Sequence, residues 1–294
     1  MTLTSVSGVG VGHWTDSVGK TGVTVITFPE PNRAAVEVRG AAPGSRELAL
    51  LNPGMRVEQI QGIVLTGGSA FGLATADGVV RALEADGRGH QTPHGLVPIV
   101  PTAVIYDFFA GSPDARPGPE EGAAAYQSIS HDPVAMGAVG AGTGATVAGW
   151  RGWDHMRPGG LGSAASTAGS CTVGALAVVN SVGDVFSLEG EPLTGGPMRP
   201  GSPGFEPAVL ENTTLVVMAT DARLSRNDLM RLNVRAHDAI GACVRPGHTR
   251  YDGDVAFAVS CGEVEDDLDA VGEAAFLAVG DAIEAAVRAT EEEG

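Results

Sequence analysis

The stretch ENTTLVVM, residues 211–218, decides how the rest of the chain is interpreted. A small polar junction, Asn212 and Thr213, leads directly into a run of apolar and β-branched residues, which predicts a buried strand. Upstream, residues 190–211 are rich in Gly and Pro and predict a long loop. If the chain were cut before Thr213, that residue would carry a free α-amine beside its own Oγ, a nucleophile with a base attached. From these residues alone, an ordinary turn and strand start is the competing interpretation.

Composition limits the partners of the chain. It has 294 residues, 43% of them hydrophobic, which is enough for a sizeable core. The formal net charge of -17 repels phosphate groups, so neither nucleic acid nor an anionic membrane surface is an expected partner. Lys20 is the one lysine in the sequence, which excludes mechanisms that need a lysine elsewhere.

The cysteines and histidines predict neither a disulfide scaffold nor a metal site. Cys171, Cys243 and Cys261 are an odd number, widely spaced, and each is expected to be a small buried hydrophobe. His90 and His94 are separated by a proline-containing loop and do not share a helix face, so no metal or other cofactor is expected. A secretion signal and an 18-residue apolar run are both missing, which predicts a cytoplasmic protein.

Hydrophobic patterns along the chain predict blocks of strands with helices between and after them. This order indicates an α+β sandwich and a single domain over residues 1–294. The Gly-rich segment 139–147 is expected to be a strand, residues 151–162 an irregular loop, and residues 172–180 and 184–188 a strand pair. The other expected strands are 9–13, 21–28, 34–39, 60–65, 97–107, 213–220 and 255–260, and the expected helices are 71–85, 119–130, one that begins after Ser225 and extends to Cys243, and 268–290.

Two short motifs could carry chemistry. The glycine turn 67–69 precedes a predicted helix and could hold an anion or oxyanion on its N–H groups, or could simply be a close-packed turn. Asp252 and Asp254, in the motif YDGD, could orient an amine, bind a cation or form a turn. His237 and His248 are expected to be structural.

Seven motifs together resemble the family of self-processing aminopeptidases and amidases typified by L-aminopeptidase/D-Ala-esterase (DmpA), which includes the β-aminopeptidases and the nylon-oligomer hydrolases. No single motif is specific, but their order along almost the whole chain is. They are LTGGSAFGLATADGV (65–79), AVIYDF (103–108), GAVGAGTGATV (137–147), GGLGSA (159–164), VGALAVVNSVGD (173–184), NTTLVVMATDARLS (212–225) and YDGDVAFAVSCG (251–262).

The resemblance implies a precursor that cleaves its own chain before a Thr or Ser. In this sequence the scissile bond would join Asn212 to Thr213, giving an α part of residues 1–212 and a β part of residues 213–294. It also implies a four-layer αββα sandwich that resembles N-terminal-nucleophile hydrolases. A homo-oligomer, a tetramer or larger, is expected as well.

The resemblance further implies roles for five side chains. Thr213 would be the nucleophile, and Asn180 matches the asparagine that helps to stabilise the oxyanion. Tyr106 matches a tyrosine near the same site. Asp252 and Asp254 match the acidic pair that supports the nucleophile and its amine. The physical requirements agree, because acyl transfer needs a base for Oγ and fixed donors for the developing negative charge.

One departure from the family pattern concerns a lysine. Relatives often carry a lysine after the Gly-rich strand or just before the GG pair, but residues 148–150 and 157–160 contain none. Arg151 or Arg157 could stand in for its charge, although arginine does not act as a base at neutral pH.

Three functions follow as alternatives. The first is an N-terminal-threonine aminopeptidase or amidohydrolase that cleaves short peptides or amino amides through an acyl-enzyme on Thr213. The second is an acyltransferase of the ornithine-acetyltransferase type. The third is an uncleaved, non-catalytic relative. A single intact chain on a denaturing gel would separate the third from the other two.

Overall fold

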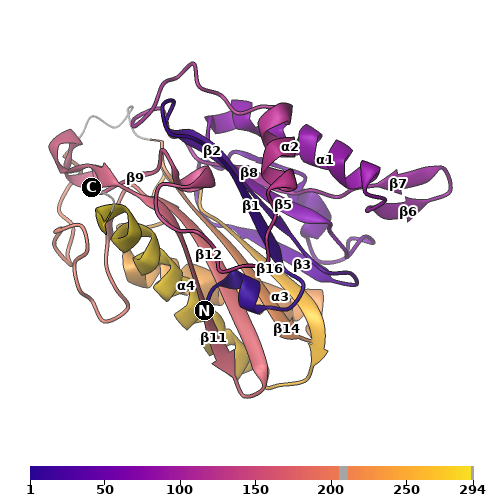
Figure 1. Cartoon of the computed structure of the whole chain (residues 1–294). Helices are drawn as coiled ribbons and strands as arrows, with labels where there is room; N and C mark the ends of the chain where they lie inside the picture. The colour runs from indigo at the N-terminus through magenta and orange to yellow at the C-terminus, as the bar shows by residue number, and fades with distance from the viewer. Residues whose placement is uncertain (205–210, 293–294) are drawn as a thin grey trace.

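The computed structural model describes residues 1–204 and 211–292, and its elements form four layers: helices, sheet, sheet, helices (Figure 1). The expected αββα sandwich is therefore confirmed. The first sheet contains, in spatial order, β1 (Gly10–Asp16), β2 (Thr21–Thr27), β5 (Gly62–Thr66), β8 (Thr102–Val104) and β4 (Ser45–Arg46). The second contains β11 (Gly160–Ala168), β12 (Cys171–Asn180), β14 (Thr213–Ala222), β16 (Val255–Val264) and β3 (Arg33–Val38).

Two helices cover the outer face of each sheet. The first sheet is covered by α1 (Thr75–Ala85) and α2 (Pro119–Gln127), and the second by α3 (Arg226–Cys243) and α4 (Leu268–Glu292). Shorter elements connect them: the strand pairs β6 (His90–Thr92) and β7 (Gly95–Val97), β9 (Thr146–Val147) and β10 (Arg157–Pro158), β13 (Asp184–Val185) and β15 (Val244–Arg245), and the 3-10 turns η1 (Leu3–Ser5), η2 (Leu48–Leu51), η3 (Ser69–Ala74), η4 (Gly140–Gly142), η5 (Gly149–Arg151) and η6 (Trp153–His155).

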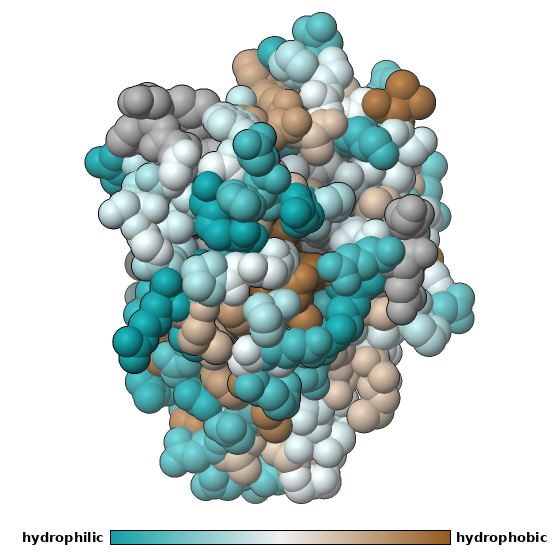
Figure 2. All heavy atoms as spheres, turned by 90° about the vertical axis from the view of Figure 1, so that its left-hand side faces the viewer, coloured by the Kyte–Doolittle hydropathy of each residue, from teal (hydrophilic) through white to brown (hydrophobic). Residues whose placement is uncertain are grey.

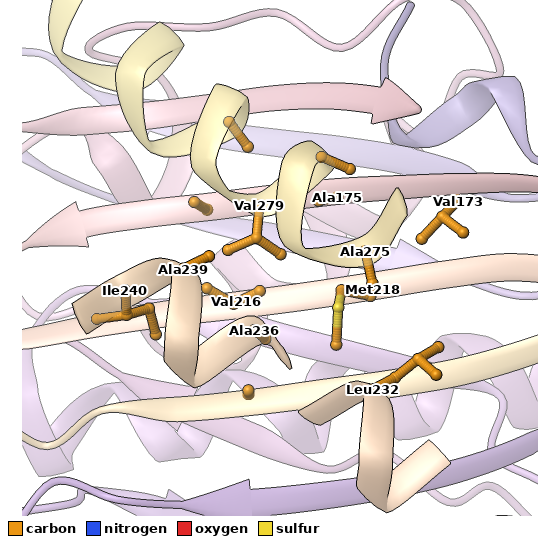
Figure 3. Packing of buried hydrophobic residues seen from close by; sticks show 14 of the residues in the cluster. Val173, Ala175, Val216, Met218, Leu232, Ala236, Ala239, Ile240, Ala275 and Val279 are labelled. Atoms are coloured by element: carbon orange, nitrogen blue, oxygen red, sulfur yellow. The ribbon is translucent and has the colours of Figure 1, made fainter. Parts of the chain in front are cut away.

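Both faces of β14 are buried, which is why its sequence is an unbroken apolar run. Leu215 and Val217 point into the core between the two sheets, whereas Val216 and Met218 point toward the helix layer. Figure 3 shows this second set, with Val216 and Met218 packed below Val279 and Ala275 of α4. The first residue of β14 is therefore fixed by packing on both sides of the strand.

The start of α3 follows the predicted cap. Ser225 Oγ accepts a hydrogen bond from the backbone N–H of Asp228, and the Asp228 carboxylate accepts one in return from the backbone N–H of Ser225. This reciprocal pair satisfies N–H groups that have no partner within the helix.

Two predicted strands are wrong or too long. Within residues 139–147, Gly140 has φ of 51° and belongs to a 3-10 turn, so only Thr146–Val147 is extended. An added Cβ at Gly140 would lie 2.3 Å from Thr24 Oγ1, so the glycine serves close packing and not a strand. Within residues 97–107, Val97 ends β7 and Thr102–Val104 forms β8, and the segment between them is not strand because prolines at positions 98 and 101 remove two backbone donors.

The pairing of residues 172–180 with 184–188 is also wrong. β12 pairs with β11 on one side and β14 on the other, while β13 pairs with β15. β11 lies partly within the segment expected to be irregular, and its small residues, GLGSAASTA, give no strand signal. Those small residues let α4 approach closely, since a Cβ on Gly162 would lie 2.1 Å from the carbonyl oxygen of Ala282.

Other boundaries differ by a few residues. The predicted helix 71–85 begins as the 3-10 turn η3 and becomes α-helical at Thr75. Part of the predicted loop 190–211 lies outside the described residues, namely 205–210. Among the helices of the described chain, none has the length and apolar character needed to cross a bilayer.

Candidate active site

Thr213 lies at the first position of β14, in the middle of the second sheet. It is 4% exposed and stands opposite Asn180, the last residue of β12, in antiparallel register. On its other side Asn212 forms a parallel bridge with Asp252, just before β16. The strand pairing therefore brings together residues from three distant parts of the chain.

The carbonyl oxygen of Asn212 is the most closely held group in this cluster. Thr213 Oγ1 donates to it at 2.5 Å, and the backbone N–H of Gly253 donates to it at 2.9 Å. The N–H of Asn212 in turn donates to the carbonyl of Tyr251 at 3.0 Å. A hydroxyl and a fixed backbone donor thus converge on the carbonyl of one peptide bond.

Asn180 is fully buried, and its side-chain amide is oriented by contacts with two residues, Thr146 and Tyr106. Its Oδ1 accepts a hydrogen bond from the backbone N–H of Thr146 at 2.8 Å. Its Nδ2 donates to the carbonyl oxygen of Tyr106 at 3.2 Å. An amide nitrogen carries two N–H groups, so one remains for another acceptor.

Tyr106 reaches the cluster through its backbone rather than through its phenol. Its half-buried ring packs against Phe108 and Phe109, with ring centroids 4.9 Å away in both cases. Phe109 in turn contacts Trp153 at 5.1 Å. Tyr106 therefore begins an aromatic wall that leads away from Asn180.

Asp254 anchors the start of β14 from the opposite side. Its Oδ1 accepts from the backbone N–H of Thr214 at 2.6 Å. Its Oδ2 accepts from His248 Nδ1 at 2.6 Å and from the His248 backbone N–H at 3.2 Å. Burial alone would lower the pKa of His248, but the hydrogen bond and charge of Asp254 outweigh burial and raise it.

Asp252 is buried beside Asp254, and its carboxyl oxygens accept hydrogen bonds from backbone N–H groups and a hydroxyl. Its Oδ2 accepts from the N–H and hydroxyl of Thr249 at 2.9 and 2.7 Å, and its Oδ1 accepts from the N–H of Val182 at 3.3 Å. Burial, followed by the charge of Asp254, raises the pKa of Asp252 well above its usual value. Two carboxylates close together inside the protein favour a cationic neighbour.

The sequence predicted only a structural role for His248, yet in the structure its ring forms a hydrogen bond with Asp254. Its ring lies edge-on to His237, with centroids 4.9 Å apart, and burial lowers the pKa of His237 to about 4. One sequence feature could have identified His248 as part of the site: it lies six residues before Asp254, in the segment that turns back toward β16. Gly253 was also missed, because a backbone N–H leaves no trace in residue identity.

The glycine turn 67–69 has its N–H groups occupied by the protein itself. Gly68 N–H donates to Asp107 Oδ1 at 2.9 Å, and Ser69 N–H donates to the carbonyl of Ile105 at 3.0 Å. The Gly68 N–H is thus taken by the buried carboxyl group of Asp107, which also accepts from Thr21 Oγ1 at 2.6 Å. The close-packed turn is the interpretation that fits.

The two arginines considered for the missing lysine lie in different settings. Arg151 is bound to Asp184, with Nη2 to Oδ1 at 2.7 Å, and also donates to the carbonyl of Thr194. That contact positions the segment after β13. Arg157 is exposed and lines a cavity that Thr146 also lines.

Comparisons with known structures identify the fold. The structure of an L-aminopeptidase D-Ala-esterase/amidase from Ochrobactrum anthropi, described as a prototype for the serine aminopeptidases and a variant of the Ntn hydrolase fold, superposes with a TM-score of 0.79 at 26% identity, covering 98% of this chain and 86% of that one. A β-aminopeptidase from a Burkholderia species superposes with a TM-score of 0.73 at 23% identity, covering 98% and 85%. The fold class is therefore that of this Ntn hydrolase variant.

Sequence comparison then gives the family. The model of Peptidase family S58 matches residues 2–293, so the chain belongs to that family and is a hydrolase of peptide or amide bonds. An uncharacterized aminopeptidase of Mycobacterium leprae is 41% identical over 90% of this chain and 79% of its own length. A 6-aminohexanoate-oligomer endohydrolase of Paenarthrobacter ureafaciens is 32% identical over 87% of this chain and 73% of its own length.

Proposed function

We propose that this protein is a self-processing N-terminal-threonine amidohydrolase that cuts the Asn212–Thr213 bond and then cleaves amide bonds of short peptides or amino amides. The observation that carries the proposal is the buried Thr213 hydroxyl, 2.5 Å from the Asn212 carbonyl oxygen, with the Gly253 N–H on the same oxygen. The names of the relatives, an aminopeptidase and an oligomer endohydrolase, support amide-bond hydrolysis.

Self-processing begins with attack by Thr213 Oγ on the carbonyl carbon of Asn212. The oxygen of that carbonyl becomes negative, and the Gly253 N–H is positioned to stabilise it. The C–N bond then breaks, the nitrogen gains a proton, and an ester joins Asn212 to Thr213 Oγ. Water hydrolyses the ester and leaves a carboxylate on Asn212 and a free α-amine on Thr213.

The new α-amine supplies the base for the second reaction. It can take the proton of Thr213 Oγ as that oxygen attacks the substrate carbonyl, and can return it to the leaving amine. Asp254, which holds the neighbouring N–H of Thr214, supplies negative charge for the ammonium form. The ammonium in turn would favour the ionised form of the adjacent Asp252, whose pKa is raised in the uncut chain by burial and by the charge of Asp254.

Stabilisation of the substrate oxyanion falls to Asn180 in this proposal. The Asn180 side chain is oriented by Thr146 and Tyr106 and has a second N–H available. Tyr106 then contributes its carbonyl as the group that orients Asn180. Removing one such donor typically costs about 10²–10³ in rate.

The direct experiment is denaturing gel electrophoresis of purified protein, with identification of the N-terminal residue of the small fragment. Wild type should give two fragments, residues 1–212 and 213–294, and the small fragment should begin with Thr213. Thr213→Ala should remain one chain and hydrolyse no aminoacyl-nitroanilide, whereas Thr213→Ser should be cut and active. A Thr213→Ala variant that is still cut would refute the assignment of the nucleophile.

The remaining expectations can be tested with the same material. The peptidase family supports hydrolysis over acyl transfer, and product analysis with an added amine acceptor separates the two reactions. A cytoplasmic homo-oligomer, a tetramer or larger, remains our proposal for the assembled protein. Light scattering coupled to gel filtration measures the subunit number, and a monomeric active enzyme would contradict the proposed oligomer.

A further inference from the structure

A cavity of about 600 Å³ lies beside the candidate active site, a size typical of small-molecule sites. It adjoins Asn180 through Thr146, which lines the cavity and donates its N–H to Asn180 Oδ1. The aromatic wall that begins at Tyr106 continues into it through Phe109 and Trp153. The cavity is therefore within reach of a substrate whose carbonyl lies at Thr213.

The charge of the cavity is opposite to that of the whole protein. Among the residues that the structure describes, its lining includes Lys20 and Arg157 and no acidic residue, although the chain carries a net charge of -17. Within residues 1–204 and 211–292, neither cation forms an ion pair; Arg157 donates only to the carbonyl oxygens of Asp154 and Met156. Two unpaired cations beside aromatic rings fit an anionic group attached to an apolar body.

The position of Lys20 is imposed by the fold. It lies in the turn between β1 and β2 with φ of 55°, a left-handed conformation that a lysine rarely adopts. Its carbonyl packs against Gly144, where an added Cβ would lie only 1.9 Å away. The turn therefore fixes the backbone of Lys20 at the edge of the cavity that this residue lines.

Trp153 supports the same interpretation. It is 47% exposed at the cavity, an unusual position for a large aromatic side chain, and it contacts Phe109. Figure 2 views the molecule from the end where β9 and the C-terminus of α4 lie, and shows apolar surface in a hollow between hydrophilic groups.

We infer that this cavity, lined by Lys20, Phe109, Thr146, Trp153, Arg157 and Thr290, binds the leaving part of the substrate, and that Lys20 and Arg157 select substrates ending in a free carboxylate. The inference rests on the proposed amidohydrolase function. In a short peptide cut after its first residue, the C-terminal carboxylate necessarily lies on the leaving side. The preferred class is therefore di- and tripeptides with an apolar residue at a free C-terminus.

The test compares two substrates that differ only in that group: Ala-Phe with a free carboxylate and Ala-Phe amide. We expect wild type to favour the acid in kcat/KM. Lys20→Gln and Arg157→Gln should each reduce the acid-to-amide ratio on the order of 5- to 10-fold, while amide hydrolysis and self-cleavage remain. Arg223→Gln removes the same charge at an exposed ion pair with Glu265 and should leave the ratio unchanged.

The outcomes separate this inference from the proposed function. If wild type cleaves neither substrate and no aminoacyl-nitroanilide, the amidohydrolase proposal fails. If it cleaves the nitroanilide but not Ala-Phe, the proposed function stands and the carboxylate subsite is refuted. If wild type cleaves both and the ratio is the same in all variants, the proposed function stands and the carboxylate subsite is refuted. A purely structural role for Lys20 or Arg157 would lower the melting temperature and both rates together, leaving the ratio unchanged, which also refutes the subsite.

Discussion

Replacing Gly253 with alanine should block self-cleavage for a steric reason. An added Cβ would lie 2.8 Å from Thr213 Oγ1, 2.5 Å from the carbonyl oxygen of Ala42 and 3.0 Å from Cα of Pro43. Relaxed contacts of this kind are about 3.5 Å or longer, so the Thr213 hydroxyl or the loop at residues 42–43 must move by roughly 0.5–1 Å. The φ of Gly253 is not left-handed, so space is the obstacle.

The expected magnitude follows from that displacement. A misplacement of about 1 Å in a reacting group can reduce the rate on the order of 10²-fold, and overpacking destabilises by about 1–3 kcal/mol. We therefore expect Gly253→Ala to fold but to remain largely uncleaved when wild type is fully cleaved. The assay follows the fraction of intact chain with time by denaturing gel and intact mass.

Two controls make the result interpretable. Gly241→Ala in α3 adds the same methyl group where nothing lies within 4 Å, and it should cleave at the wild-type rate and gain about 0.5–1 kcal/mol of stability. The effect of Gly253→Ala on stability is measured by comparing the Thr213→Ala variant with the Thr213→Ala/Gly253→Ala double variant, because both are expected to remain uncut. A well-folded Gly253→Ala that matures at the wild-type rate would refute the proposed geometry.

Three further predictions concern the polar groups of the site. Asn180→Ala should lower amide hydrolysis by about 10²–10³-fold in kcat, and an unchanged kcat would remove Asn180 from the oxyanion site. His248→Ala should slow maturation roughly tenfold by releasing Asp254, while His248→Asn, whose Nδ2 can replace Nδ1, should recover part of the rate; equal rates in the two variants would contradict a positioning role. Burial and the charge of Asp254 raise the pKa of Asp252 from 3.8 to about 7. Between these two pH values the folded state holds a proton on Asp252 that the unfolded state has lost, so the protein loses stability as the pH rises from about 4 to about 7. In the Thr213→Ala background, Asp252→Asn lacks this loss, and its free energy of unfolding relative to the parent should rise between pH 4 and pH 8; a constant difference in urea titrations would contradict the assignment.

Residue patterns predicted the features that depend on local chemistry. The unbroken apolar run of β14 and the Ser225 cap of α3 are confirmed because each depends on a few neighbouring residues. Asn180 and Thr213, which the family resemblance linked through their motifs, face each other across two strands.

The patterns failed where glycine and alanine predominate. β11 was missed because small residues carry little hydrophobic signal, although they permit close packing of α4. The Gly-rich segment 139–147 was predicted to be a strand, but Gly140 within it lies in a turn. The contact of His248 with Asp254 and the Gly253 N–H on Asn212 depend on how a loop folds back, so they could be found only in three dimensions.

The order of strands in the second sheet has a consequence for the mature enzyme. β14 and β16 would belong to the small fragment, yet they lie between β12 on one side and β3 on the other, both from the large fragment. Separating the fragments would therefore break two strand interfaces and open both cores at once. The mature pair should behave as a single cooperative unit, with dissociation inseparable from unfolding, and mixing separately produced fragments should restore activity only after both are refolded together.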